Sequence, residues 1–332
     1  MFRTRTLFVI GAGASCEFNF PSGPTLLQRI AKNVNLHWKR QGLDQGNIVV
    51  ERTLRTLADG DKERLEALVS GGRRIAQAAS IGRSIDNVIE QQESADAEIV
   101  GKIGIVQAII AAEADSPLMS TTDACAGTWL HGLAQQLTEN VSRSRVEDIF
   151  ENVRFISFNY DRCLEHFLPT ALSLAYGIPG DEARKIVARQ VIVHPYGTLG
   201  MLPWQTPASN GVDFGIPTPN FMTSSWENIQ TFSESTRDPK ITRSVEEYVA
   251  WANRIAFLGF GFHRPNIEML RQGEIANARE VLGTIYDVPA PETHLIRQSM
   301  SSFLKYGDPD RPKTYNVKCA EFMRQNFAVL TS

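Results

Sequence analysis

The sequence contains few cysteines, and none of them are close together. Cys16, Cys125, Cys163 and Cys319 stand singly, with no Cys-x-x-Cys motif and no spacing typical of a disulfide framework. We therefore expect reduced thiols in a cytoplasmic protein. The six histidines also lack the spacing of a metal site, so we predict that the protein holds no zinc.

An excess of charge of one sign is also absent. The 34 Lys and Arg residues against 37 Asp and Glu residues give a formal net charge of -3, which predicts no direct binding to nucleic acid or to an anionic membrane. No apolar run approaches the length of a membrane span, and the apolar stretch after residues 1–5 is too short for a signal peptide. With 332 residues, 42% of them hydrophobic, the chain is long enough to bury one large core.

The stretch from Thr6 to Ser15 predicts a buried strand that ends in a glycine turn. Its first five residues are apolar, aromatic or β-branched, and Gly11 and Gly13 follow directly. If a helix opens near Ser15, its backbone N–H groups and positive dipole end favour a phosphate-bearing ligand. The turn matches two glycines of the dinucleotide-binding fingerprint, with Cys16 at the position of the third. A turn formed for packing alone is the alternative.

Three later predicted strands also end in polar residues or glycines. They are 153–158, followed by Asn159 and Asp161; 191–193, followed by His194; and 255–258, followed by Gly259 and Gly261. Open parallel sheets bind ligands at the carboxyl ends of their strands, so these residues are candidates for chemistry. Two alternatives stay open. Asp161 is able to cap the following helix, and a lone histidine such as His194 is more often structural than a general base.

Strands that alternate with helices over the whole length predict a doubly wound parallel α/β sheet of the Rossmann-like kind. We expect one dinucleotide-binding domain over residues 1–290, with a helical insertion at about 40–150 and a lid-like loop at 201–240. A helical tail over residues 291–332 is expected to pack on this domain. The apolar face of the tail at 296–304 suits either the core or an oligomer contact.

The ordered set of strand ends resembles the sirtuin-like family of nicotinamide dinucleotide-binding domains. Its members carry a Gly-Ala-Gly-Ala/Ile-Ser turn, an Asn-x-Asp strand end, a His-Gly segment and a later glycine-rich strand end, and the resemblance spans residues 7–285. Three phrases look most like the bacterial branch found in phage-defence systems, which degrades the dinucleotide. They are Ser84-Ile85-Asp86, Phe158-Asn159-Tyr160-Asp161-Arg162 and Gly259-Phe260-Gly261-Phe262.

This resemblance implies NAD as the substrate and a role for each matching residue. Gly11, Ala12, Gly13 and Ser15 would lie at the phosphates, Asn159 and Asp161 around the nicotinamide ribose, His194 as the base, and Gly259 and Gly261 beside the adenosine half. The implied activity is that of an NAD glycohydrolase (NADase), which hydrolyses NAD to nicotinamide and ADP-ribose as the effector of an anti-phage defence system. The resemblance also implies a homo-oligomer and control by a regulatory partner such as an ATPase.

Two other functions stay open. A protein deacylase of the same family would use Asn159 and His194, but such enzymes carry a zinc module with paired cysteines, and this chain has no cysteine between Cys163 and Cys319. A binding module that senses NAD or ADP-ribose derivatives would need neither the asparagine nor the histidine. His194 is also separated from Gly197 by two residues, whereas the family usually has histidine and glycine adjacent.

Overall fold

The computed structural model describes residues 1–120, 125–206, 211–218, 220–273, 277–308 and 310–332. The chain divides into two compact units. The sheet unit comprises Met1–Phe18, Ser120–Pro195 and Ser233–Ser332, and the helical unit comprises Asn19–Met119 and Tyr196–Phe232. The helical unit thus begins earlier and ends earlier than the insertion expected at about 40–150, and it takes in most of the segment expected to be a lid-like loop.

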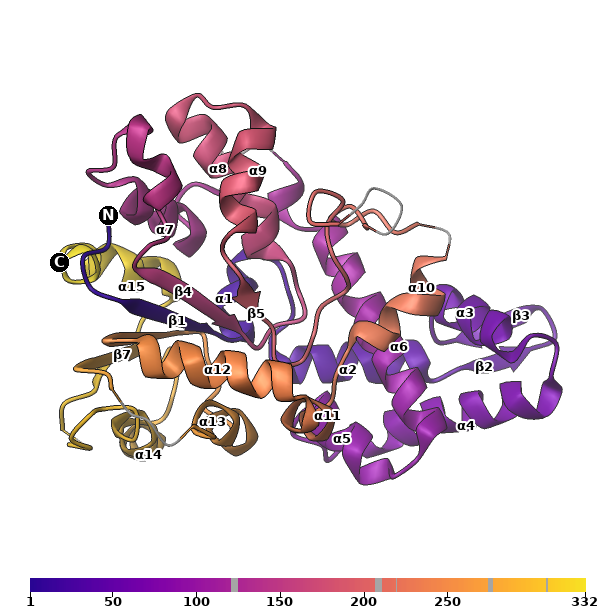
Figure 1. The fold of residues 1–332 in the computed structure, drawn as a ribbon. Coiled ribbons are helices and arrows are strands. Elements are labelled where there is room, and N and C mark those ends of the chain that lie inside the picture. Colours follow the sequence, from indigo (N-terminus) through magenta and orange to yellow (C-terminus); the bar gives the residue numbers. More distant parts are fainter. Residues whose placement is uncertain (121–124, 207–210, 219, 274–276, 309) are drawn as a thin grey trace. The chain divides into compact units, whose positions relative to one another are not determined.

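The sheet unit contains six parallel strands in the order β5-β4-β1-β6-β7-β8 (Figure 1). They are β1 (Thr6–Ile10), β4 (Val153–Ser157), β5 (Ile192–Val193), β6 (Arg254–Leu258), β7 (Glu280–Thr284) and β8 (Lys313–Tyr315). Counted along the chain, these six strands have the order 3-2-1-4-5-6, which is that of the Rossmann fold. The predicted doubly wound parallel sheet is therefore confirmed. The direction of winding reverses between β1 and β6.

Helices cover both faces of this sheet (Figure 1). The connection from β4 to β5 places α8 (Cys163–Tyr176) and α9 (Gly180–Ala188) on one face, and α12 (Pro239–Trp251), α13 (Arg264–Leu270) and α14 (Ala290–Ser301) lie on the other. The other helices here are α1 (Ala12–Ser15), η1 (Cys16–Phe18), α7 (Trp129–Thr138), η4 (Arg143–Asp148), α11 (Phe232–Arg237), α15 (Cys319–Gln325) and α16 (Phe327–Thr331). The C-terminal residues contain the expected helices and also contribute β8 to the sheet.

The central strands are buried because helices lie over both of their faces. Every residue of β1 and of β6 is buried, which explains why both strands appear in the sequence as nearly continuous apolar runs. Phe8 packs against Phe2 and Phe155, with ring centroids 5.8 and 5.7 Å away. Such contacts fix the position of β1 at the middle of the sheet, and with it the position of the glycine turn.

Glu17, in the segment after the glycine turn, forms hydrogen bonds with the starts of two helices. Its carboxylate accepts hydrogen bonds from the backbone N–H groups of Trp129 at 2.9 Å and Ala320 at 2.8 Å, in the first turns of α7 and α15. The buried indole of Trp129 donates to the carbonyl of Ala14 at 2.9 Å. A carboxylate at a helix N-terminus is favourable because it pairs N–H groups that the helix leaves free and meets the positive dipole end.

The helical unit is built from helices and one short hairpin. Its elements are α2 (Gly23–Val34), β2 (His37–Lys39), β3 (Gly42–Gln45), α3 (Ile48–Ala58), α4 (Lys62–Ala78), α5 (Ile85–Gln92), α6 (Ala95–Ala114), η2 (Pro117–Met119), α10 (Phe221–Ser224) and η5 (Ser225–Asn228). Ser84 caps α5 by accepting a hydrogen bond from the backbone N–H of Asn87. No helix in the described ranges is long and apolar enough to cross a membrane.

The segment expected to be a lid-like loop at 201–240 is only partly irregular. It contains α10, η5, α11 and the start of α12, while residues 207–210 and 219 lie outside the described residues. Within the helical unit, the buried carboxylate of Glu113 on α6 accepts a hydrogen bond from the backbone N–H of Gly215 at 2.9 Å. The segment is therefore hydrogen-bonded at Gly215 to α6, a helix of the same unit.

Candidate functional site

The carboxyl ends of β1, β4 and β6 meet at one place in the sheet unit. β1 lies between the other two strands, with Ile10 in register with both Ser157 and Leu258. Gly11 and Gly259 directly follow Ile10 and Leu258, and Asn159 follows Ser157 by two residues. This is also the point where the strand order reverses, and open α/β sheets bind ligands in the crevice at such a point.

The glycines of the turn are required by the close approach of β6. A Cβ atom added to Gly11 would lie 2.6 Å from the carbonyl oxygen of Gly259, and one added to Gly13 would lie 2.9 Å from the Cα of Gly259. Gly259 itself has a φ of 56°, which is open mainly to glycine, and its carbonyl accepts from the Gly13 N–H at 2.9 Å. The side-chain faces of both glycines are thus filled by protein backbone, which supports packing as the reason for these glycines.

The turn continues into a short helix that opens earlier than expected. α1 begins at Ala12 and is four residues long, and η1 extends the helical stretch to Phe18. Gly13 and Gly261 are exposed and Ala12 is half-buried, so these three predicted contact residues reach the surface of the sheet unit. Any contact that they make with a ligand is through backbone or a methyl group.

A buried network of hydrogen bonds joins the glycine turn to the end of β4. The side-chain amide of Asn159 donates to the carbonyl of Gly11 at 3.0 Å and to the hydroxyl oxygen of Ser15 at 2.9 Å. Ser15 in turn donates to Asp161 Oδ2 at 2.7 Å, and Asp161 Oδ1 accepts from the backbone N–H of Cys163 at 3.2 Å. Asp161 therefore pairs the first N–H of α8 from the position before the N-cap residue, Arg162, and the one hydroxyl donor of Ser15 is used within the protein.

Asn159 keeps one polar atom without a partner. Its Oδ1 is buried and accepts no hydrogen bond, and the whole residue is only 5% exposed. Buried polar atoms are nearly always paired with protein or ordered water, so this oxygen marks a place for a hydrogen-bond donor from outside the chain. A ribose hydroxyl, which the resemblance would place here, has the donor that the oxygen lacks. The end of β4 thus offers one acceptor that suits a hydroxyl donor, whereas the filled glycine faces do not form a cradle for a dinucleotide.

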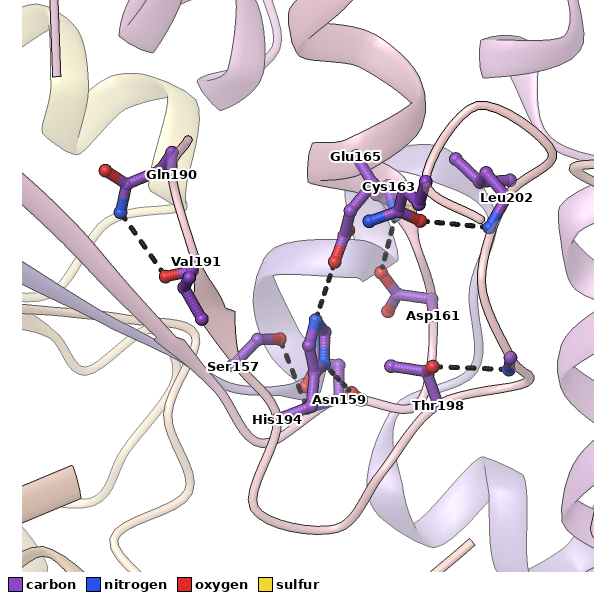
Figure 2. Close-up of polar contacts among 12 residues, drawn as sticks. Ser157, Asn159, Asp161, Cys163, Glu165, Gln190, Val191, His194, Thr198 and Leu202 are labelled. Atoms are coloured by element: carbon purple, nitrogen blue, oxygen red, sulfur yellow. Dashed lines mark hydrogen bonds and ion pairs between the residues drawn. The ribbon is translucent and has the colours of Figure 1, made fainter. Parts of the chain in front are cut away.

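His194 and Glu165 form a buried pair next to Asn159 (Figure 2). His194 Nε2 lies 2.8 Å from Glu165 Oε1, and its Nδ1 lies 3.0 Å from the backbone carbonyl oxygen of Asn159. Because a carbonyl only accepts, Nδ1 carries a proton and donates it. Burial lowers the pKa of His194, but the carboxylate of Glu165, the Asn159 carbonyl and the charge of Asp161 outweigh burial and raise this pKa above its ordinary value.

The raised pKa keeps His194 protonated to a higher pH than a free imidazole, and in the protonated form both ring nitrogens donate. That form has no free lone pair, so the role of His194 as a general base stays a prediction that requires Nε2 to lose its proton first. The second carboxylate oxygen of Glu165, Oε2, is buried and has no hydrogen-bond partner. Two unpaired acceptor oxygens, Asn159 Oδ1 and Glu165 Oε2, thus belong to the two residues that hold the imidazole.

Glu165 is the residue of this cluster that sequence reasoning misses. It lies in the first turn of α8 and is buried, on a helix whose apolar residues predict packing alone. Its spacing from Asp161 is no signal, because Asp161 precedes the helix and its N-cap Arg162, and the i, i+4 rule applies only between helical residues.

Cys16, at the position of the third fingerprint glycine, is an exposed free thiol. Its pKa is raised by partial burial and by the negative charges of Asp161 and Glu17, so it stays protonated near neutral pH. Within the described ranges, no group of three or more His, Cys, Asp or Glu side chains is arranged to hold a metal ion.

The residues predicted to contact NAD fall into two groups. Ser15, Asn159, Asp161 and His194 form one buried cluster, to which the structure adds Glu165. The glycines at the ends of β1 and β6 pack against each other beside this cluster. The sequence matches no protein-family model and no curated protein, so the geometry of this cluster is what a functional proposal must rest on.

Proposed function

We propose that the chain hydrolyses NAD to nicotinamide and ADP-ribose at the cluster of Ser15, Asn159, Asp161, Glu165 and His194. The observation that carries the proposal is the unpaired Oδ1 of Asn159. This oxygen is buried at the end of β4, in a sheet with the strand order of dinucleotide-binding folds. It is an acceptor aimed at a donor that the chain does not supply, and ribose hydroxyls and water are both such donors.

Hydrolysis of the bond between ribose and nicotinamide requires a positioned water and an acceptor for its proton. Asn159 Oδ1 orients the water or the ribose hydroxyls. Glu165 Oε2 accepts a proton from the water as the water oxygen bonds to the anomeric carbon, and the electron pair of the broken bond leaves with neutral nicotinamide. The carboxylates of Glu165 and Asp161 also stabilise the positive charge that develops on the sugar. His194 holds Glu165 in place through Nε2. It would act as the base in place of Glu165 only in its neutral form, after Nε2 has lost its proton.

The other predicted residues have supporting roles in this proposal. The N–H groups of Gly11 and Gly13 already donate to the carbonyls of Leu258 and Gly259, so of the three turn residues we assign the phosphate contact to the N–H of Ala12. Gly259 and Gly261 would border the adenosine half. The physiological role that we propose is depletion of NAD by the effector of a bacterial anti-phage system, restrained by its assembly state or by a partner. This role rests on the resemblance in sequence and not on the site.

A second function is favoured by one specific observation. Both nitrogens of His194 are engaged and its pKa is raised, so the imidazole is suited to fixing Asn159 and Glu165 and not to accepting a proton. A module that binds NAD or an ADP-ribose derivative without cleaving it would have such a histidine. Under this alternative, Asn159 Oδ1 would bind a ribose hydroxyl and no nicotinamide would be released.

The substitution Asn159→Ala tests the proposal. We expect no release of nicotinamide by the variant, because the amide that orients the reacting groups is gone, and we expect a folded protein by circular dichroism. Asn277→Ala is a matched control, since Asn277 also donates its amide to a backbone carbonyl, at 3.0 Å, but is exposed. The control should hydrolyse NAD at the parent rate.

The products separate the alternatives. Chromatography of the parent protein with NAD should show nicotinamide and ADP-ribose in equal amounts. Binding of NAD by calorimetry with no nicotinamide release would support the sensor, and release only with an acylated peptide present would support a deacylase. Unchanged hydrolysis by a folded Asn159→Ala variant would remove Asn159 from the reaction.

A further inference from the structure

A hollow lined by arginines opens at the amino-terminal edge of the sheet, away from the cluster around Asn159. It has a volume of about 480 Å³ and lies within the sheet unit. Pockets for small ligands span about 300 to 1,000 Å³. The central strands are five residues long, so this hollow lies about 15 Å along the strands from the carboxyl edge. A ligand in it would be a different molecule from a substrate at Asn159.

The pairing of the strands fixes the residues that line this hollow. Arg5, Asn253 and Arg279 come immediately before β1, β6 and β7, three neighbouring strands that pair in register. The N–H of Asn253 donates to the carbonyl of Arg5 at 2.9 Å, and the N–H of Arg279 donates to the carbonyl of Asn253 at 2.7 Å. The two arginines are therefore placed by the backbone of the sheet and not by a mobile loop.

One lining arginine already has a partner. The buried Arg254 lies with Nε 2.7 Å from Glu280 Oε2, and Lys313 Nζ lies 2.8 Å from the other oxygen of the same carboxylate. Burial raises the pKa of Glu280, but these two cations outweigh burial and hold the pKa below its ordinary value. Glu280 stays ionised and is shared between two cations, so it does not neutralise the rest of the hollow.

The other arginines carry unmatched charge. Arg3, Arg5 and Arg279 line the hollow, are exposed, and have no carboxylate partner in the part of the chain that the structure describes. Arg5 lies over the ring of Trp251, 5.9 Å from its centroid, which restricts the position of its guanidinium. Four lining arginines against the one lining acid, Glu280, leave an excess of three positive charges.

We propose that this hollow binds a small polyphosphate, either free pyrophosphate or the diphosphate of a nucleotide. Guanidinium groups bind phosphate oxygens in pairs, and three unmatched guanidiniums in one concave site suit two linked phosphates. Thr4, Asn152 and Asn253 line the same hollow. The hydroxyl of Thr4 donates to the carbonyl oxygen of Ser332 and the amide of Asn152 donates to that of Phe2, so further neutral donors come from the two side-chain amides. A nucleic acid fits less well, because it requires a basic stripe along a surface and the chain has a net charge of -3.

Titration calorimetry of the full chain tests this inference, with sodium pyrophosphate and ADP as the two probes. Arg5→Gln and Arg279→Gln should each weaken binding of pyrophosphate by roughly tenfold or more, and the double variant should bind none. Arg297→Gln is the matched control. Arg297 is exposed on α14, donates to Thr314 and does not line the hollow, so this variant should bind like the parent.

The outcomes separate the sources of the ligand and the two sites. Tighter binding of ADP than of pyrophosphate assigns the hollow to a nucleotide, and the reverse assigns it to free pyrophosphate. Asn159→Ala should bind pyrophosphate like the parent, whether or not the chain hydrolyses NAD. The inference is overturned if the parent binds neither probe, if the two arginine variants bind like the parent, if Asn159→Ala loses the binding, or if duplex DNA displaces the probe.

Discussion

Replacing Glu165 by glutamine should reverse the direction in which His194 makes the free energy of unfolding change with pH. In the parent, the raised pKa of His194 means that the folded state holds its proton more tightly than the unfolded chain does. The contribution of the pair to the free energy of unfolding is therefore complete below the unfolded pKa of about 6.5 and is lost as the pH rises through the raised folded value. Glu165→Gln keeps the shape of the side chain but removes the charge that causes the shift.

The cost of this substitution should therefore be largest at low pH. Near pH 5.5 the variant buries an imidazolium without its counter-ion, and breaking a buried pair in this way costs about 3 to 5 kcal/mol. Above the raised folded pKa of His194 the imidazole is neutral in both proteins, and the loss should shrink to about 1 kcal/mol. Urea unfolding of both proteins at several pH values measures the difference between their free energies of unfolding. The titration of groups that both proteins share cancels in this difference.

An exposed ion pair gives the control for this experiment. Glu147 lies 2.9 Å from Arg189, and the two side chains are 66% and 60% exposed. Glu147→Gln should change the free energy of unfolding by less than about 1 kcal/mol at every pH. A difference between parent and Glu165→Gln that does not vary with pH, or that grows as the pH rises, would refute the buried pair as described.

Three further substitutions test separate parts of the site. Gly259→Ala should lower the free energy of unfolding by more than about 2 kcal/mol, because of its positive φ and its contact with the glycine turn; a urea midpoint equal to the parent's would contradict that packing. Glu17→Ala should cost about 2 kcal/mol in the same assay, since it removes the acceptor at two helix starts; a loss below about 0.5 kcal/mol would mean that water replaces the carboxylate. His194→Ala should slow NAD hydrolysis by about 100-fold, because Glu165 loses the contact that orients it, and should leave NAD affinity nearly unchanged. Equal losses of rate and affinity would make His194 a binding residue.

Most of the sheet could be predicted from the sequence because its central strands are buried on both faces. The strands β1, β4, β6 and β7 are recognisable in the sequence as short apolar runs, and these runs alternate with segments whose apolar residues have helical spacing. β8 could not be predicted in this way, since it has three residues, none of them buried. The start of the helical unit at Asn19 was equally hidden, because α2 has the same amphipathic pattern as a helix that packs on a sheet.

The candidate site could be predicted in outline only. Parallel strands place their ends at one edge, so the meeting of the glycine turn with Asn159 and Gly259 follows from the sequence. Why residues 11 and 13 are glycines does not follow from the sequence, because the reason lies in the backbone of Gly259, more than 240 positions away in the chain. Glu165 was missed because a single carboxylate in an apolar helix gives no sign of which side faces the strand ends.

NAD hydrolysis is tested most directly by incubating the full chain with NAD at several protein concentrations and measuring nicotinamide and ADP-ribose by chromatography, with Asn159→Ala alongside. We expect equal amounts of the two products from the parent, with a rate per molecule that rises with protein concentration if assembly controls the enzyme, and none from the variant. A parent that releases no nicotinamide at any concentration, or an Asn159→Ala variant that releases it at the parent rate, would contradict hydrolysis at this site.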